Sequence, residues 1–184
     1  VREIAVRELL IEKGILTADQ IRKQVEDWEQ KTPALGSKII ARAWCDNDFK
    51  KLLLEDGTKA VAQYDVGMAD LELKVIENTP EVHNVIVCTL CSCYPRPVLG
   101  LPPAWYKSSN YRRRVIREPR AVLKEFGTDI PEEIELRVHD STADLRYLVL
   151  PMRPDQTKNM TEKELSNIVT RDSMIGITTV RVPS

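Results

Sequence analysis

Three cysteines lie close together in the run Val87–Cys93, at positions 88, 91 and 93. The fourth cysteine of the chain, Cys45, is distant from them in the sequence. Thiolates are the ligands that soft and trivalent transition metals hold best. Three thiols with C-x-x-C-x-C spacing therefore indicate a metal site.

The same spacing allows backbone nitrogens to act as ligands. Cys93 can chelate through its sulfur and its own nitrogen, and the Ser92 and Cys93 nitrogens can close a second five-membered ring. The Cys91 sulfur and the Ser92 nitrogen close a six-membered ring, and Cys88 can cap this plane from below. One octahedral position then stays open. Because a backbone nitrogen binds only after losing its proton, the ion must be strongly Lewis-acidic, such as Co(III) or Fe(III).

Two other kinds of thiol site fit parts of this run. A structural zinc site needs four nitrogen or sulfur ligands, usually as two separated pairs. The remaining candidates are Cys45, His83 and His139, without a second C-x-x-C motif. A thioredoxin-like redox site needs a helix that starts at the first cysteine, which Pro95 and Pro97 oppose. A non-catalytic zinc-binding module and a thiol redox protein remain alternatives on spacing alone.

Length and charge narrow the class of protein. The 184 residues predict one domain with an appendage, long enough to bury a full core. Basic and acidic residues balance at 27 and 28, which argues against nucleic acid or a membrane surface as the main partner. We find no apolar run of transmembrane length and no signal-peptide pattern at Val1. Clustered thiols without a disulfide framework predict a cytoplasmic protein.

Residues 1–65 read as helices and predict an N-terminal arm or partner-contacting region. Thr17–Gln20 is a capping box, and Gly14 before it suits the end of a helix that covers residues 2–13. Ser37 is expected to cap a third helix. Residues 46–55 are expected to form a fourth helix. The first two helices have few companions to bury them. They predict either an arm over a partner subunit or a pair loosely docked on the body.

Residues 66–184 read as an α+β metal-binding catalytic domain. Alternating or continuous apolar residues predict strands at 71–75, 85–87, 134–138, 145–150 and 175–182, and helices are expected after Pro119 and after the capping box at Thr161. The fold class is therefore α+β, with a helical arm followed by a layered α/β domain. The metal-claw loop follows a short strand, which would hold it rigidly.

The cysteine run Val87–Cys93 is followed by Tyr94–Lys107, which is rich in proline and aromatic residues. Together they resemble the α subunit of nitrile hydratase, cobalt type. The resemblance covers nearly the whole chain, through the segments Glu77–Asn84, Arg117–Gly127, Arg146–Pro151 and Val169–Gly176. The related γ subunit of thiocyanate hydrolase shares the cysteine motif and is the alternative, although Tyr94-Pro95 looks more like nitrile hydratase.

The resemblance implies a hydro-lyase that adds water to nitriles and gives amides at a low-spin Co(III) centre. Members with threonine between the first two cysteines are usually cobalt enzymes, so Thr89 favours Co(III) over Fe(III). The implied metal ligands are the sulfurs of Cys88, Cys91 and Cys93 and the backbone nitrogens of Ser92 and Cys93. The implied catalytic residues are Cys91, Ser92 and Cys93, with Cys91 and Cys93 oxidised to sulfinic and sulfenic acid.

The resemblance also implies partners. In the family a β subunit completes the pocket for a small nitrile, in a heterodimer or heterotetramer, and its arginines steady the oxygens of the oxidised cysteines. A metal-loading helper protein is a further expected partner. Within this chain, Arg146 looks like the family arginine that supports the contact between subunits around the site; the alternative is a plain charge at the end of a strand.

Two positions depart from the family pattern. The family normally has an aromatic residue, usually tryptophan, where this chain has Arg96, which changes the pocket wall or the subunit contact. A glutamine-glycine-glutamate stretch of the family is here Met68–Asp70. The glutamine that would hydrogen bond near the open coordination position is therefore missing. Neither change touches a metal ligand.

Several remaining residues are expected to be structural. His83 and His139 should be hydrogen-bonded residues near strands, not ligands. Trp105–Tyr106 should pack beneath the metal loop or against a partner, and Cys45 should be a small buried apolar residue. The basic run Tyr111–Arg114 is expected to be an interface or a solvated face, not a nucleic-acid site.

Overall fold

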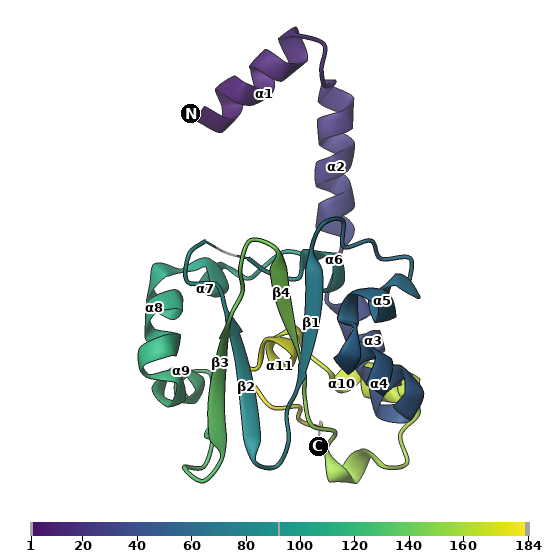
Figure 1. Cartoon of the computed structure of the whole chain (residues 1–184), viewed down its shortest axis with the longest axis vertical. Helices are drawn as coiled ribbons and strands as arrows, with labels where there is room; N and C mark the ends of the chain where they lie inside the picture. Colours follow the sequence, from purple (N-terminus) through teal and green to yellow (C-terminus); the bar gives the residue numbers. More distant parts are fainter. Residues whose placement is uncertain (1, 92, 183–184) are drawn as a thin grey trace.

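The computed structural model describes residues 2–91 and 93–182, as an arm of two helices that projects from a compact body (Figure 1). The arm consists of α1 (Arg2–Glu12) and α2 (Ala18–Gln30). The predicted capping box is confirmed, because Gln20 donates its backbone N–H to the Thr17 hydroxyl at 3.1 Å and its side chain accepts from the Thr17 N–H at 2.8 Å. Gly14 has φ +65° at the turn between the helices.

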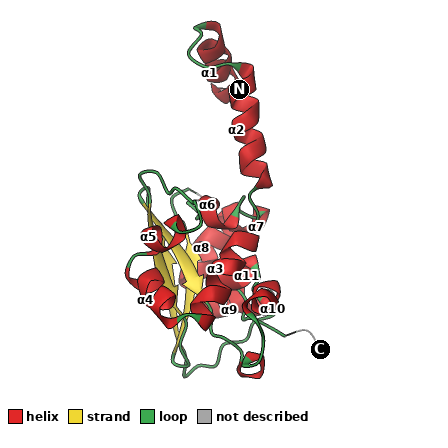
Figure 2. Cartoon of the chain, turned by 90° about the vertical axis from the view of Figure 1, so that its right-hand side faces the viewer, coloured by secondary structure: helices red, strands yellow, loops and turns green. Residues whose placement is uncertain are grey.

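The arm buries little of its own apolar surface. No residue of α2 is buried, and Val25 is 49% exposed. On α1, Ile4 and Leu9 are also about half exposed. Both views show the two helices extending away from the body, with only the end of α2 near it (Figures 1 and 2). Packing on the body therefore contributes little to these helices, and helices of this length are marginal by themselves.

The next three helices belong to the body. They are α3 (Ala34–Cys45), α4 (Asn47–Glu55) and α5 (Gly57–Ala62). The prediction that Ser37 caps the third helix is wrong, because α3 begins three residues earlier, after Pro33. Ser37 lies inside the helix and is buried, and its hydroxyl donates to the Val169 carbonyl at 2.8 Å. A distant backbone acceptor therefore uses the hydroxyl that sequence reasoning assigned to a helix end.

Among the residues that the structure describes, four strands form two parallel pairs. β1 (Glu72–Glu77) pairs with β4 (Leu145–Leu150), and β2 (Val82–Val87) pairs with β3 (Glu135–Asp140). β2 and β4 are in contact, so the strands follow one another as β3, β2, β4, β1 across the body (Figure 1). The last five residues of β2 are all buried, whereas β1 alternates between exposed and buried residues. The central position of β2 explains its continuous apolar run.

Helices on the connections cover the strands. Those between β2 and β3 are α6 (Arg96–Leu99), α7 (Ala104–Lys107), α8 (Ser109–Arg117) and α9 (Pro119–Glu125), and those after β4 are η1 (Asp155–Thr157), α10 (Glu162–Ile168) and α11 (Arg171–Ile175). Figure 2 shows α3, α10 and α11 along one side of the strand layer. The Thr161 capping box is confirmed. The arrangement agrees with the expected α+β class.

The prediction of a last strand at 175–182 is wrong. The chain ends α11 at Ile175, and Gly176 turns it with φ +86°. A Cβ at Gly176 would lie 1.9 Å from the Asn84 carbonyl oxygen, so only glycine fits this approach. The buried apolar residue Ile177 then enters the core without strand pairing. Burial alone therefore accounts for the apolar pattern that resembled a strand.

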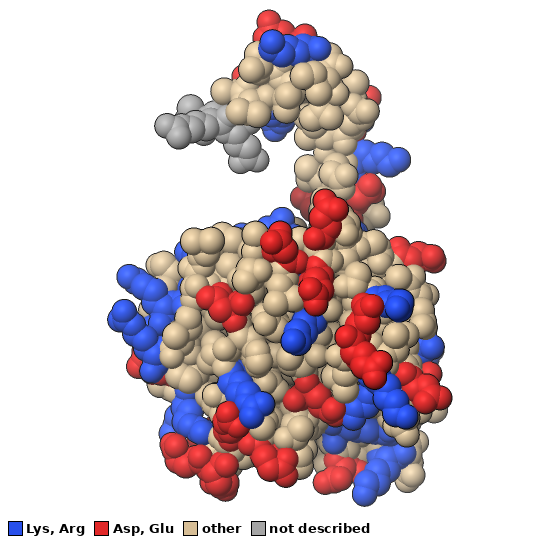
Figure 3. Space-filling model, in the orientation of Figure 1, with Lys and Arg blue, Asp and Glu red and all other residues tan. Residues whose placement is uncertain are grey.

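Charged residues are spread over the body in both signs. Figure 3 shows acidic and basic side chains interspersed on this face, with basic residues gathered over α8. Within the part of the chain that the structure describes, no helix has the length and hydropathy that crossing a membrane requires.

Candidate metal centre

The predicted cysteines come together where β2 ends. The claw loop, residues 88–95, follows Val87 directly and precedes α6. Its three sulfur atoms lie within 4.8 Å of one another, with 3.4 Å between Cys88 and Cys91 and 3.1 Å between Cys91 and Cys93. Cys88 is buried, Cys93 is half-buried and Cys91 is exposed, and none of the three forms a disulfide. The three cysteines of the loop therefore range from buried, at Cys88, to exposed, at Cys91.

This donor set fits a thiophilic metal ion. The Cys91 backbone N–H points at the Cys88 sulfur at 3.3 Å, so the chain already wraps around one point. Three soft sulfur donors suit cobalt, iron or zinc, and each thiol must lose its proton to bind. Ser92, predicted to supply a backbone nitrogen ligand, lies outside the described residues. Among those described, no histidine or carboxylate joins the sulfur cluster as a fourth side-chain ligand, which a zinc site would need.

Asp140 holds the first turn of the claw loop. It ends β3 opposite Val87, and its carboxylate accepts from the Thr89 backbone N–H at 2.9 Å and from the Thr89 hydroxyl. Bonds to a charged acceptor are stronger than neutral ones, so the loop is tied to the neighbouring strand. Sequence reasoning missed this role, although an acid at the end of a strand parallel to β2 was the available signal.

An aromatic cluster supports the other end of the loop. Tyr106 is fully buried, and its hydroxyl donates to the Cys93 carbonyl at 2.9 Å. Its ring packs edge-on against Tyr94 at 5.0 Å between centroids, and Trp105 packs against Tyr111 at 4.9 Å. The expectation that Trp105–Tyr106 packs beneath the metal loop is therefore confirmed for Tyr106. The loop is therefore hydrogen-bonded to the body at Thr89, through Asp140, and at Cys93, through Tyr106.

The protonation of Cys93 depends on its surroundings. Burial raises the pKa of the Cys93 thiol to about 12, and hydrogen bonding with the Cys91 and Cys88 thiols adds to this. The positive charge of Arg146 lowers the pKa of the same thiol. A bound cation would add a much larger favourable charge, because a coordinating thiol is deprotonated outright.

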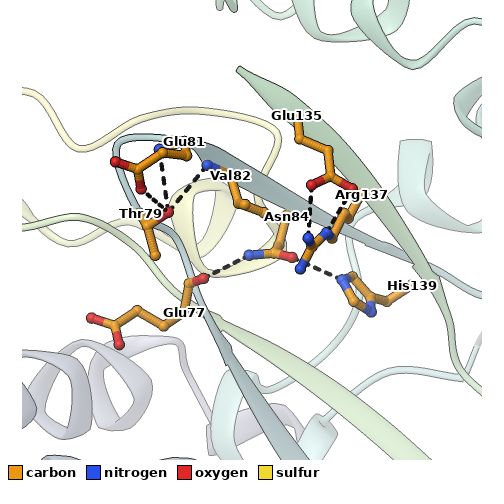
Figure 4. A network of polar contacts seen from close by, with 8 residues as sticks. All are labelled: Glu77, Thr79, Glu81, Val82, Asn84, Glu135, Arg137 and His139. Carbon is orange, nitrogen blue, oxygen red and sulfur yellow. Dashed lines mark hydrogen bonds and ion pairs between the residues drawn. The ribbon is translucent and has the colours of Figure 1, made fainter. Parts of the chain in front are cut away.

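The two histidines have structural partners. His83 is buried, and its ring bonds the Gly176 carbonyl at 2.8 Å and the Asn78 amide at 3.3 Å. His139 bonds the Asn84 side-chain oxygen at 2.8 Å, and the Asn84 amide in turn donates to the Glu77 carbonyl (Figure 4). The prediction that both histidines are hydrogen-bonded residues is confirmed. Sequence reasoning did not identify Asn84, which links β2 to β3 and to the end of β1.

Cys45 differs from its expectation. It ends α3 and is exposed, not buried. The tryptophan beside it, Trp44, is half-buried and donates its indole N–H to the Pro151 carbonyl at 2.9 Å. The helix therefore turns Trp44 inward and leaves Cys45 outside. This fourth thiol is not part of the sulfur cluster.

A hollow of about 270 Å³ lies beside the outer sulfurs. It forms at the end of the body where β2 finishes, β1 and β4 begin and α2 meets the body (Figure 1). Its lining is Trp28, Leu71, Cys91, Cys93, Tyr94, Arg96, Pro97 and Arg146. Two larger hollows of about 520 and 540 Å³ are lined only by arm residues and their connecting turn, without thiols. Of these three hollows, the one at the claw loop is the one that is lined by thiols.

Comparison with characterised proteins agrees with this geometry. The sequence profile described as "Nitrile hydratase, alpha chain" matches residues 1–178. The chain belongs to the nitrile hydratase α chain family. The low-molecular weight cobalt-containing nitrile hydratase subunit alpha of Rhodococcus rhodochrous is 50% identical over 182 residues, which are 98% of this chain and 88% of that protein.

Solved structures of the nitrile hydratase family have the same fold. A recombinant thiocyanate hydrolase with partially modified cobalt centres superposes with a TM-score of 0.91 at 43% identity, covering 97% of this chain and 88% of that one. A double mutant of the Fe-type nitrile hydratase from Comamonas testosteroni Ni1 superposes with a TM-score of 0.92 at 39% identity, covering 100% of this chain and 93% of that one. These relatives therefore include both cobalt and iron proteins.

The two departures from the nitrile hydratase pattern have different structural settings. Ala69 has φ +50°, a left-handed conformation that favours glycine. Arg96 is exposed at the start of α6 and lines the hollow beside Cys91 and Cys93. Arg146 lines the same hollow and donates to the Ala143 and Leu145 carbonyls at 3.1 and 3.2 Å. Two cations therefore flank the sulfurs.

Proposed function

We propose that this chain is the metal-binding catalytic α-type subunit of a nitrile hydratase, which hydrates a small nitrile to its amide. The observation that carries the proposal is the convergence of three sulfurs within 4.8 Å on a loop that the body holds at both ends. Cys88, Cys91 and Cys93 would hold the ion through sulfur, and Ser92 and Cys93 through backbone nitrogen. Cys91 and Cys93 would be oxidised to sulfinic and sulfenic acid, which the exposed and half-buried positions of their sulfurs permit.

We propose Co(III) as the ion, with Fe(III) as the alternative. Thr89 between the first two cysteines and relatives that are named cobalt-containing support cobalt. When bound, the trivalent ion would act as a Lewis acid that draws electron density from the nitrile. Thr89 also has a positional role, since its backbone N–H and hydroxyl tie the loop to Asp140.

The residues of the chain itself would position the substrate. Trp28, Leu71 and Pro97 would supply apolar walls on part of the hollow beside the sulfurs. Arg146, anchored on backbone carbonyls, would hold a positive charge next to Cys93 and support the contact with the partner subunit. Tyr106 fixes the Cys93 carbonyl and thereby the direction of the Cys93 main chain.

The partner would be a β-type subunit, in a heterodimer or heterotetramer. Relatives of this chain are named as subunits, and the hollow at the claw loop is open on one side. We assign residues 1–65 to the partner-contacting N-terminal region, with α1 and α2 as the segment that reaches out, and 66–184 to the metal-binding domain. A metal-loading helper and a cytoplasmic location complete the proposal, since exposed thiols persist in a reducing compartment.

The test is peptide mass spectrometry with metal quantification on the chain produced with its partner subunit. We expect about one cobalt per chain, a gain of two oxygens on Cys91 and one on Cys93, and hydration of a simple nitrile such as propionitrile. Tetrahedral zinc on unmodified thiols, with no nitrile hydration, would contradict the proposal and favour the zinc-binding module.

A second candidate is a thiocyanate hydrolase γ-type subunit. It is favoured by the fold and sequence similarity to the solved thiocyanate hydrolase and by Arg96 in the hollow. Assays of thiocyanate and of propionitrile on the same loaded preparation separate the two functions.

A further inference from the structure

Three consecutive arginines on α8 have different partners. Arg114 pairs with two glutamates, and Arg113 is exposed and donates to a backbone carbonyl of its own helix. Arg112 instead reaches the claw loop, where its Nη1 donates to the Thr89 carbonyl at 3.3 Å. The basic run on α8 therefore contributes one cation to the loop that carries the sulfurs.

Buried neighbours of Arg112 fix α8 against the strand that leads into the claw loop. Tyr111 is buried, and its hydroxyl donates to the Ile86 carbonyl of β2 at 2.8 Å. Val115, one turn further along α8, is fully buried as well. Arg112 therefore extends from a helix whose place beside the end of β2 is set by other residues.

Thr89 is held on both sides of its α-carbon. Its backbone N–H donates to Asp140 at 2.9 Å, and its carbonyl accepts from Arg112. The 3.3 Å distance to Arg112 is long for a hydrogen bond, and the full charge of the guanidinium adds to its strength. Only two residues separate Cys88 from Cys91, so the direction of the Thr89 backbone affects where the second sulfur lies relative to the first.

Arginines also hold other loops of this fold through backbone carbonyls. Arg120 donates to four carbonyls of the segment 130–134, and Arg153 donates to three carbonyls. Arg112 is half-buried, and within the described residues its Nε is buried without a partner and its one acceptor is in the claw loop. Because burying part of a charge without a counterion is unfavourable, the contact with the claw loop is the benefit that this placement offers.

We propose that Arg112 is a positioning residue, which fixes the Thr89 backbone together with Asp140 and so sets the spacing of the Cys88 and Cys91 sulfurs before a metal binds. It acts through Thr89 and does not touch the substrate. Its effect on metal retention rests on the proposed function, whereas the closed state of the claw loop is a property of this chain alone.

Loss of the Arg112 guanidinium should open the claw loop locally. In the closed loop Cys88 is fully buried, and its sulfur accepts from the Cys91 N–H at 3.3 Å. Removing a hydrogen bond from a charged donor typically shifts a local equilibrium of this kind by about tenfold or more. Arg112→Gln should therefore expose Cys88 more often, while the body stays folded.

The experiment measures how fast iodoacetamide labels Cys88 in the metal-free, fully reduced chain, with peptide mass spectrometry as the readout. Cys45, an exposed thiol outside the sulfur cluster, is the internal reference in every sample. We expect the ratio of the Cys88 rate to the Cys45 rate to rise about tenfold in Arg112→Gln. Loss of a nearby positive charge by itself would make a thiol less reactive, so a higher ratio reports opening of the loop.

Arg113→Gln is the matched control, because it removes the same charge from the next residue of the same helix and leaves the bond to Thr89 in place. It should leave the labelling ratio unchanged. Arg112→Lys keeps the charge without the planar guanidinium and should give an intermediate ratio. The melting temperature of each variant should stay within about 3 °C of the wild type, because Tyr111 and Val115 keep α8 in place. Equal ratios in Arg112→Gln and Arg113→Gln would overturn the inference.

Cobalt retention connects the claw loop to the metal. In the cobalt-loaded complex with the partner subunit, Arg112→Gln should lose cobalt to EDTA about ten- to a hundredfold faster than the wild type, the range typical of residues that orient metal ligands. Arg113→Gln should retain cobalt as the wild type does.

The outcomes separate this inference from the proposed function. An unchanged Cys88 ratio in Arg112→Gln, with nitrile hydration intact, would overturn the inference alone. A wild-type complex that binds no cobalt and hydrates no nitrile would overturn the proposed function, and the labelling ratio would still decide the role of Arg112. If Arg112→Gln does not fold, a wild-type ratio in Arg112→Lys would likewise overturn the inference.

Discussion

The body holds the claw loop and the N-terminal arm to different extents. The loop is tied to β3 through Asp140 and to the buried ring of Tyr106, so its sulfurs are positioned by the chain itself. The arm contacts the body only near its end, where Gly100 approaches the Lys31 carbonyl so closely that a Cβ would lie 2.1 Å from it. The difference agrees with the proposals of a metal site prepared within this chain and of a partner subunit that covers the arm.

The largest effect should come from the sulfur cluster. Cys93→Ser should lower the rate of nitrile hydration by about a thousandfold or more, because it removes a soft ligand and an oxidisable sulfur together. Cys45→Ser is the matched control, since this exposed thiol lies outside the cluster and should leave activity and cobalt content unchanged. Cobalt content per chain and hydration rate are the measurements. Full activity in Cys93→Ser would show that the loop is not the site.

The arm should matter for association and not for folding. Val25→Asp puts a charge on the exposed apolar stripe of α2, and we expect it to weaken binding to the partner subunit by about tenfold or more. The melting temperature of the chain alone should change by less than about 3 °C, because Val25 is not buried. Gln24→Asp, on the exposed neighbouring position, adds the same charge as a control. A Val25→Asp chain that unfolds, or that binds its partner normally, would contradict the contrast between arm and loop.

Loss of the hydrogen bonds between Thr89 and Asp140, which tie the claw loop to β3, should have an intermediate effect on metal retention. Asp140→Ala removes both acceptors of Thr89, and residues that orient metal ligands typically contribute about 10- to 100-fold in metal affinity or activity. Asp144→Ala, an exposed acid in the turn between β3 and β4, removes the same charge without touching the loop. Cobalt retention after dialysis against a chelator measures the difference. Equal retention in both variants would mean that the body does not prepare the site.

The smallest effect concerns the body alone and appears as a dependence of stability on pH. Burial lowers the pKa of His83, and burial together with the charges of Arg137 and Lys74 lowers the pKa of His139. Between the usual histidine pKa of about 6.5 and the lowered folded value, the unfolded chain binds protons that the folded chain does not. Stability is therefore full above about pH 6.5 and falls as the pH decreases, with a slope of up to about 1.4 kcal/mol per pH unit for each histidine.

Urea unfolding between pH 5 and pH 8 measures this slope. His83→Gln should reduce the slope while lowering stability at pH 8, because the buried ring is hydrogen-bonded on both nitrogens. Stability that rises between pH 7 and pH 5 would contradict the assignment of both histidines as neutral structural residues.

Sequence patterns that act over a few residues predicted much of the fold. The capping boxes at Thr17 and Thr161, Pro119 at the start of α9 and the strand alternation of β1 all form as expected. The predictions failed where a distant group competes with a local signal. Ser37 bonds Val169 instead of capping a helix, and Ile177 is buried without being in a strand. Short-range periodicity cannot distinguish these cases, because burial and strand pairing produce the same apolar pattern.

By itself, the spacing of Cys88, Cys91 and Cys93 determined the kind of chemistry, because donor atoms three and two residues apart can reach one ion without help from the rest of the chain. Only the tertiary structure decided what holds and surrounds that site. Asp140 and Arg146 reach it from parts of the chain about fifty residues away, through the parallel pairing of β3 with β2 and of β4 with β1. Strand order and register bring such residues together, and these depend on packing of the whole body.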